Sequence, residues 1–205
     1  MPVKLISTGG GSVTLTTPST ASDFTATFPT NTGDVVTTGS SAAVTPTMLS
    51  QPLTRGTAQN TTSGTSIDFT SIPSWVKRVT VMFNNVSTTG TNNILIQLIH
   101  SGGTVVSSGY RSASARFSGS AVAAASSTAG FLINTVVATD DHYGSYVFTN
   151  LSGNIWTGVG GVTYGGGPVT SCGGVSIAST LTGIRITTTG GTFTFDTGSI
   201  NILYE

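Results

Sequence analysis

Four aspartates in the C-terminal three-quarters of the chain could support acid–base chemistry. Asp68, Asp140, Asp141 and Asp196 could supply the two carboxylates of a glycosidase, which flank the bond that is cleaved. Asp140 and Asp141 are adjacent, and neighbouring residues of a strand point to opposite faces, so they would make a poor pair. We therefore interpret residues 140–144 (DDHYG) as a polar turn between two apolar runs. A polysaccharide-cleaving enzyme that uses these acidic residues is kept as the last of three functional hypotheses.

Nucleophilic catalysis by a serine would need a histidine that a carboxylate orients. The chain has two histidines, His100 and His142, and it lacks the G-x-S-x-G nucleophile motif. The sequence therefore does not favour a serine hydrolase. Its many serines are interpreted as solvent-facing residues of strands and turns.

Metal, thiol and phosphate chemistry have weak support in the sequence. The group Asp140, Asp141 and His142 offers too few ligands at no regular spacing, and the single Cys172 is expected to be a buried or incidental thiol. No glycine-rich phosphate-binding motif occurs. We assign no catalytic, cofactor-binding or metal-binding residue, and we expect no cofactor and no enzymatic activity.

Aromatic residues in glycine-rich segments could stack on sugars. Tyr110, Tyr143, Trp156 and Tyr164 lie in or beside such segments. The alternative, which we favour, is core packing for Trp156 and loop anchoring for the tyrosines.

The composition excludes binding that depends on long-range electrostatics. Charged residues make up 7% of the chain, against about 25% in an average protein, and the formal net charge is zero. Neither nucleic acid nor an anionic membrane is therefore expected as a partner. The sequence shows no signal peptide and no membrane span, so we expect synthesis in a cytoplasm.

The length and composition of the apolar runs change near residue 53. Residues 1–53 contain short alternating runs at 13–16, 24–28 and 35–36, which prolines and glycines interrupt. So few large apolar side chains cannot offset the entropy of ordering this segment. We predict that residues 1–53 form an extended attachment segment that becomes ordered against copies of itself or another protein.

Residues 54–205 carry longer apolar runs with aromatics, separated by links rich in Gly, Asn and Ser. This pattern predicts an all-β fold, an antiparallel β-sandwich of the jelly-roll kind. The alanine-rich residues 121–129 are interpreted as a strand-to-loop excursion rather than a helix. The predicted strands are 66–69, 75–83, 94–100, 130–137, 145–150, 155–159, 175–177, 183–189, 192–195 and 200–204.

Two groups of motifs resemble structural proteins of tailed phages. The N-terminal segments GGGSVTLTTP (9–18), ASDFT (21–25) and NTGDVVTTG (31–39) are similar to stretches of phage fibres and other virion proteins. The C-terminal segments IPSWVKRVTVMF (72–83), RITT (185–188) and FTFDTGSINILYE (193–205) resemble a recurrent module of phage tail and virion proteins. The resemblance implies a β-rich, commonly trimeric component of the virion surface, and it implies no catalytic residue.

We therefore expect a capsid decoration, cement or short head-fibre protein. Its partners would be further copies of itself, as a homotrimer, and the major capsid protein or another virion structural protein. The second hypothesis is a tail-fibre receptor-binding protein that recognises host surface glycan.

Overall fold

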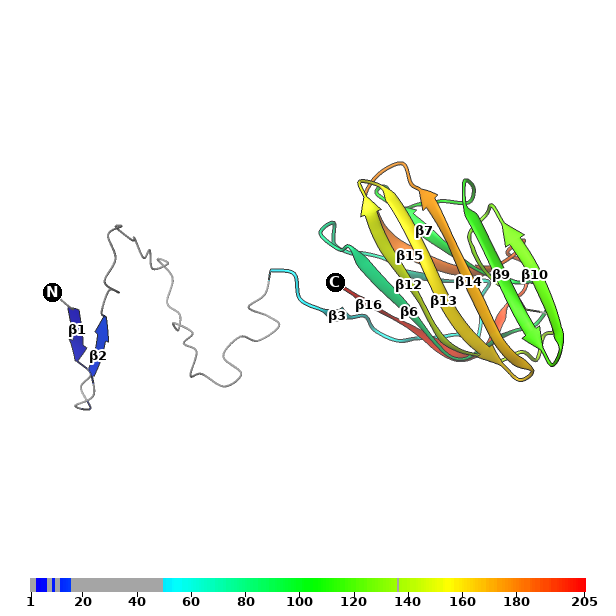
Figure 1. Ribbon diagram of the computed structural model, residues 1–205, viewed down its shortest axis with the longest axis horizontal. Coiled ribbons are helices and arrows are strands. Elements are labelled where there is room, and N and C mark those ends of the chain that lie inside the picture. Colours follow the sequence, from blue (N-terminus) through cyan, green and yellow to red (C-terminus); the bar gives the residue numbers. More distant parts are fainter. Residues whose placement is uncertain (1–2, 7–8, 10–11, 16–49, 136) are drawn as a thin grey trace. The chain divides into compact units, whose positions relative to one another are not determined.

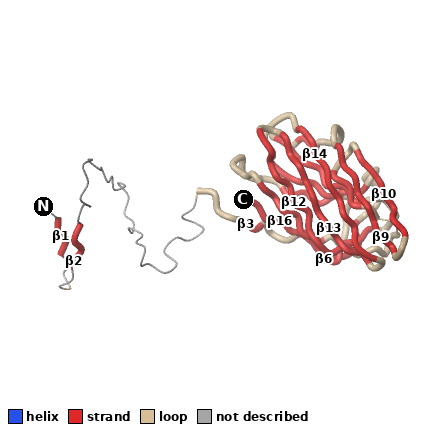
Figure 2. The backbone as a smooth tube through the Cα atoms, viewed as in Figure 1, coloured by secondary structure: helices blue, strands red, loops and turns tan. Residues whose placement is uncertain are grey.

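The computed structural model describes residues 3–6, 9, 12–15, 50–135 and 137–205. The described residues form antiparallel strands, loops and turns, with no helix among them (Figure 2). The predicted all-β, antiparallel class is therefore confirmed. Among these residues no helix is long and apolar enough to cross a membrane.

The chain consists of two compact units, residues 1–43 and 44–205. In the first, β1 (Val3–Ile6) pairs with β2 (Ser12–Leu15) as an antiparallel hairpin, in which Val3 lies opposite Leu15. The runs predicted at 24–28 and 35–36 lie outside the described residues. The attachment role of residues 1–53 and its boundary at residue 53 stay predictions.

The larger sheet of the second unit has nine strands in the order β10-β9-β14-β13-β12-β6-β16-β3, and β4 also pairs with β16. Figure 1 shows β12, β13, β14, β9 and β10 side by side in this sheet. Its strands are β3 (Thr54–Arg55), β4 (Gln59–Asn60), β6 (Arg78–Thr88), β9 (Arg111–Ser118), β10 (Ala121–Ser127), β12 (His142–Ser152), β13 (Ile155–Tyr164), β14 (Gly167–Ser176) and β16 (Phe195–Tyr204).

The smaller sheet has five strands and lies against one face of the larger one (Figure 1). Its order is β11-β7-β15-β5, and β8 pairs with β7. The strands are β5 (Ser66–Phe69), β7 (Ile94–His100), β8 (Thr104–Val105), β11 (Phe131–Ile133) and β15 (Leu181–Thr188).

The core lies between the two sheets because the apolar residues of the strands alternate. On β6, Val79, Val81 and Phe83 are buried while Arg78 is exposed, which is the two-residue period of a half-buried strand. At the centre, Phe131 of β11 packs on the rings of Tyr146 and Phe148 of β12, with centroids 5.7 and 4.8 Å away. The aligned arrangement of two sheets around one core is that of a sandwich.

Serines join the edge strand β11 to the opposite sheet. Ser112 Oγ accepts a hydrogen bond from Leu132 N at 2.9 Å, Ser114 Oγ accepts one from Asn134 N at 3.2 Å, and Ser171 Oγ donates to Leu132 O. These serines are buried, so the interpretation of the serines as solvent-facing is wrong for them. They satisfy backbone groups of β11 that no neighbouring strand could pair.

The predicted strands differ from the observed ones mainly where small residues dominate. β9 was not predicted, and residues 121–127 form a regular strand, β10, rather than an excursion into a loop. β6 begins at Arg78 instead of residue 75, because the preceding turn carries Val76 into the core. The run 200–204 belongs to the longer strand β16, which begins at Phe195, whereas residues 192–194 form no strand.

Candidate functional site

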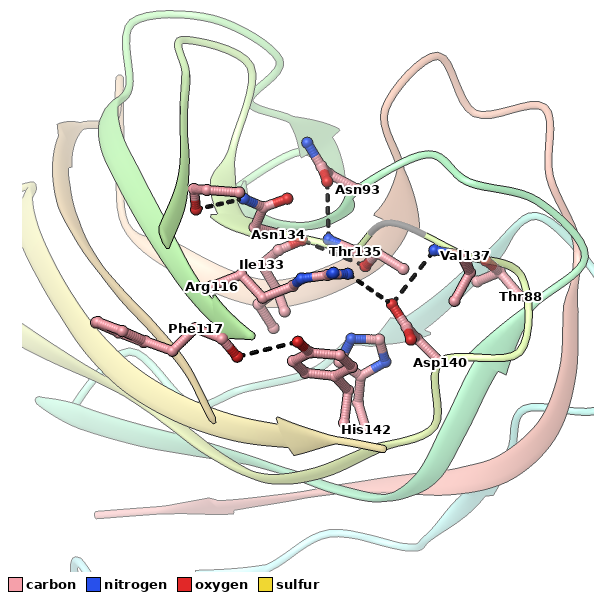
Figure 3. Close-up of polar contacts among 12 residues, drawn as sticks. Thr88, Asn93, Arg116, Phe117, Ile133, Asn134, Thr135, Val137, Asp140 and His142 are labelled. Carbon is pink, nitrogen blue, oxygen red and sulfur yellow. Dashed lines mark hydrogen bonds and ion pairs between the residues drawn. The ribbon is translucent and has the colours of Figure 1, made fainter. Parts of the chain in front are cut away.

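A buried cluster of polar side chains lies between the sheets at one end of the sandwich (Figure 3). Arg116 reaches inward from β9, and its Nη1 donates to Asp140 Oδ2 at 3.3 Å. The two side chains are 14% and 6% exposed. Asp140 also accepts a hydrogen bond from the backbone N–H of Val137 at 3.3 Å. Each charge of this buried pair stabilises the other, because burying either charge without its partner would cost free energy.

The ring of Tyr164 packs against the guanidinium group of Arg116. The Arg116 Cζ lies 4.4 Å from the centroid of the Tyr164 ring, a cation–π contact. The Tyr164 hydroxyl donates to the carbonyl of Phe117 at 3.0 Å. Tyr164 therefore anchors β13 to β9 and orients Arg116 towards Asp140.

His142 points into the same region and is fully buried. Its Nδ1 lies 3.1 Å from the carbonyl of Val86, which can only accept, so Nδ1 carries the proton. Burial lowers the pKa of His142 below its ordinary 6.5, although the Val86 carbonyl and the charges of Asp140 and Asp141 act in the opposite direction. His142 is therefore a neutral ring at neutral pH.

Two nitrogens of this cluster have no hydrogen-bond partner within the described part of the chain, Arg116 Nε and His142 Nε2. Asp140 closes a turn, because its N–H donates to the carbonyl of Val137 at 3.1 Å, and Asp141 lies in the link before β12. The interpretation of residues 140–144 as a turn is wrong for His142 to Gly144, which begin β12. The alternation of β12 carries His142 inward with Tyr146 and Phe148. The apolar run that follows His142 is short, so the sequence alone did not predict that His142 is buried.

The other predicted carboxylates lie elsewhere in the sandwich and have their own partners. Arg185 of β15 binds Asp68 of β5 through two hydrogen bonds, from Nε at 2.7 Å and from Nη2 at 2.6 Å. Asp196 accepts a hydrogen bond from the Ser87 hydroxyl. Within the described ranges, no group of three or more His, Cys, Asp or Glu side chains is placed to hold a metal ion.

The other histidine, His100, lies beside Ser179 and contacts hydroxyl and carbonyl oxygens. Its Nδ1 lies 3.0 Å from Ser179 Oγ and 3.0 Å from the carbonyl of Ser101. Ser101 Oγ and Ser179 Oγ are 2.6 Å apart. This small network joins the ends of β7 and the loop before β15, so it serves to fasten two loops.

Three of the four aromatic residues considered for sugar stacking are buried. Tyr110, Trp156 and Tyr164 are 1%, 3% and 8% exposed. Tyr110 accepts from Leu98 N at 2.8 Å and donates to Val106 O at 3.1 Å. Tyr143 is 44% exposed on the outer face of β12, and its hydroxyl donates to Asn85 Oδ1 at 2.8 Å. Only Tyr143 of the four is available for stacking.

Cys172 is exposed on the outer face of the nine-stranded sheet. It lies at a shallow hollow of about 400 Å³, which is also lined by Ala113, Ala115, Ala124 and Val159. Of the two expectations, a buried or an incidental thiol, the buried one is therefore wrong, because the alternation of β14 turns Cys172 outward and Ser171 inward.

Comparisons with protein-family models, with curated proteins and with solved structures find no match to this chain. The geometry of the described residues and the motifs of the sequence are therefore what a functional proposal has to rest on. The buried cluster offers strong internal bonds, and the outer face of the large sheet offers an accessible apolar surface.

Proposed function

We propose that this chain is a non-enzymatic structural protein of the surface of a tailed-phage virion, a homotrimeric capsid decoration, cement or short head-fibre protein. Its N-terminal segment attaches it to the particle, and its sandwich is exposed. The observation that carries the proposal is that the sandwich has a hydrophobic core of its own, with residues from β5 to β16, and that residues 1–43 form another unit. The phage-like motifs of both parts support it.

Attachment in this proposal depends on backbone and apolar contacts. The chain has seven basic and seven acidic residues, too few for a strongly charged interface. The N-terminal segment is rich in Thr, and an extended segment of this kind can add to the edge of a neighbouring sheet. Such strand addition would bridge and clamp adjacent capsid subunits without a large side-chain core.

Electron cryomicroscopy of the virion that carries this chain tests the proposal. Density for the sandwich at local threefold positions between capsid subunits is the expected result. A chain that starts at Thr54 should fold and fail to load onto particles, because β3, the first strand of the sandwich, begins there. Loading of that shortened chain at the full level would overturn the role given to the N-terminal segment.

The exposed ring of Tyr143 favours a second candidate, recognition of host surface glycan at a tail tip. Asn85 holds the Tyr143 hydroxyl, so the ring is oriented on the surface at little further entropic cost. A sugar could stack on it beside Thr163, whose hydroxyl donates to the Tyr143 carbonyl at 3.4 Å.

Adsorption of the purified protein to host cells tests this candidate. Tyr143→Ala should abolish adsorption, whereas Tyr143→Phe should retain most of it, because stacking uses the ring and not the hydroxyl. Density at the tail tip in the virion map would agree with this role. Equal adsorption of Tyr143→Ala and the wild type would remove Tyr143 from any glycan site.

A further inference from the structure

Exposed apolar side chains gather on one face of the sandwich, the outer face of the nine-stranded sheet. Val159 and Val122 are 62% and 61% exposed, and Phe117 and Ile155 also stand above this face. Single exposed apolar residues are ordinary on protein surfaces, but a contiguous patch usually marks an interaction site. Four neighbouring strands, β10, β9, β14 and β13, carry this patch, and we call their outer surface the outer apolar face.

The register of the strands makes the outer apolar face continuous. Cys172 of β14 lies between Ala113 of β9 and Val159 of β13. In the next row, Ala115 lies opposite Ala124 on one side and Thr170 on the other. These small side chains line the hollow of about 400 Å³. Phe117 and Val122 face each other at the end of the β9–β10 hairpin and form an apolar corner beside the hollow.

The outer apolar face carries almost no charge. Arg111 and Arg116 are the only charged residues in its four strands, and Arg116 points inward to Asp140. Arg111 lies at one end, opposite Gly174. By contrast, the five-stranded sheet carries the half-exposed ion pair of Asp68 and Arg185. A partner with charged side chains would lose their hydration against the outer apolar face without gaining an opposite charge.

We propose that the outer apolar face binds a second copy of this chain, with the corner formed by Phe117 and Val122 of one copy seated in the hollow of the next. This inference rests on the self-association in the proposed function and names the surface responsible. The same face of another copy is an uncharged surface of matching chemistry, and its alanines and glycines let two backbones approach closely. Because the corner of one copy meets a different part of the face in the next copy, the contact is head-to-tail, and a head-to-tail contact whose rotation closes gives a ring such as the proposed trimer.

Three variants of the full-length chain test the proposed interface. Val159→Glu and Thr170→Glu each place a charge in the outer apolar face at exposed positions, so the fold should tolerate both. Thr70→Glu is the matched control, because Thr70 is exposed and directly follows β5 of the five-stranded sheet, outside the four strands and outside the N-terminal segment. Sedimentation velocity gives the oligomeric state, and circular dichroism checks that each variant is folded.

The single thiol gives an independent readout at the same face. Cys172 should react with a bulky maleimide quickly at low protein concentration and slowly once copies associate. Only free copies react, so labelling should slow about ten-fold when nine-tenths of the copies are associated. Val159→Glu and Thr170→Glu should sediment as monomers with fast labelling at all concentrations, and Thr70→Glu should behave as the wild type.

Two results would overturn the inference in different ways. An oligomer that both glutamate variants retain, with Cys172 labelled quickly in it, would show that the copies associate through another surface; the proposed homotrimer would survive. A wild-type protein that stays monomeric up to its solubility limit would refute self-association itself. The loading of the same proteins onto particles would then show whether a monomeric chain still attaches, so loss of self-association and loss of attachment are distinguished.

Discussion

At the scale of single residues, the sandwich holds a fixed positive charge beside a histidine that burial keeps neutral. Arg116 is neutralised by Asp140 and covered by Tyr164, whereas the Nδ1 of His142 binds the carbonyl of Val86, an uncharged group. A proton added to His142 would create a second positive charge in the same enclosed region. The cluster is therefore a place where stability should depend on protonation and on charge balance.

The stability of the sandwich should fall as the pH drops below the ordinary histidine value. Burial lowers the pKa of His142 in the folded state below the 6.5 of the unfolded state. Below about pH 6.5 the unfolded chain therefore binds a proton that the folded chain does not, at a cost of up to about 1.4 kcal/mol per pH unit. Above that pH the full stability is present.

Urea unfolding at pH 5 to 8 measures this dependence. His142→Gln should lower the stability at pH 8 and flatten its decline between pH 7 and 5. His100→Gln is the matched control and should keep the decline of the wild type. A slope in His142→Gln as steep as that of the wild type would assign the dependence to other groups.

Removal of one charge of the buried pair should cost far more than removal of one charge at the surface. Asp140→Asn leaves the Arg116 charge without its carboxylate in an enclosed site, and we expect a loss of about 3 kcal/mol in the free energy of unfolding. The Arg78–Glu205 pair, with side chains 54% and 45% exposed, is the comparison. Glu205→Gln should cost less than about 1 kcal/mol.

Chemical denaturation of both variants measures the two costs. The further change Arg116→Met in the Asp140→Asn background should recover part of the loss, because it removes the unpaired charge. Equal, small losses for Asp140→Asn and Glu205→Gln would mean that water reaches the Arg116 charge.

At the scale of elements, the sequence predicts the strands whose large apolar residues alternate, and it misses those built from small residues. Residues 66–69 and 94–100 were predicted with the observed bounds of β5 and β7. β9 was missed because its inward positions are Ser112, Ser114 and Arg116, polar residues that become buried only through partners on β11 and Asp140. Partners distant in sequence cannot be read from a local pattern, and His142 was missed for the same reason.

The glycines of β13 should differ sharply in their tolerance of a side chain, according to the face on which they lie. A Cβ at Gly160 would come within 2.6 Å of the Ser145 carbonyl and of the Tyr146 ring, whereas the nearest atom to a Cβ at Gly161 is 3.6 Å away. Gly160→Ala should therefore cost about 1–3 kcal/mol through overpacking. Gly161→Ala should change stability by less than about 0.5 kcal/mol.

Thermal and urea unfolding of these two variants, at a concentration where the chain is monomeric, check this difference. Similar stabilities would mean that β12 can move away from β13 without cost, and that the packing of Tyr146 against β13 does not hold the sheet.

At the scale of the whole chain, we expect that the residues from β3 onwards contribute to the stability of the sandwich and that the residues before β3 do not. Residues 54–61 run along β16: Gly56 N donates to Ile202 O at 2.8 Å, and Thr61 donates to Gly198 O at 3.0 Å and, through its hydroxyl, to Thr197 O at 2.7 Å. Thr61 is fully buried. These bonds close the edge of the nine-stranded sheet that β16 would otherwise present.

Two shortened chains separate attachment from stability. A chain that starts at Thr54 keeps every strand of the sandwich, so its urea midpoint should match that of the full-length chain. A chain that starts at Ser63 loses these three hydrogen bonds and also the pairing of β3 and β4 with β16, so it should lose at least about 3 kcal/mol, at roughly 1 kcal/mol for each of the three bonds. It should also aggregate more readily, because β16 becomes an open edge. A loss of stability already in the chain that starts at Thr54 would mean that the N-terminal segment helps to hold the sandwich together, and its removal could then no longer serve as a clean test of attachment.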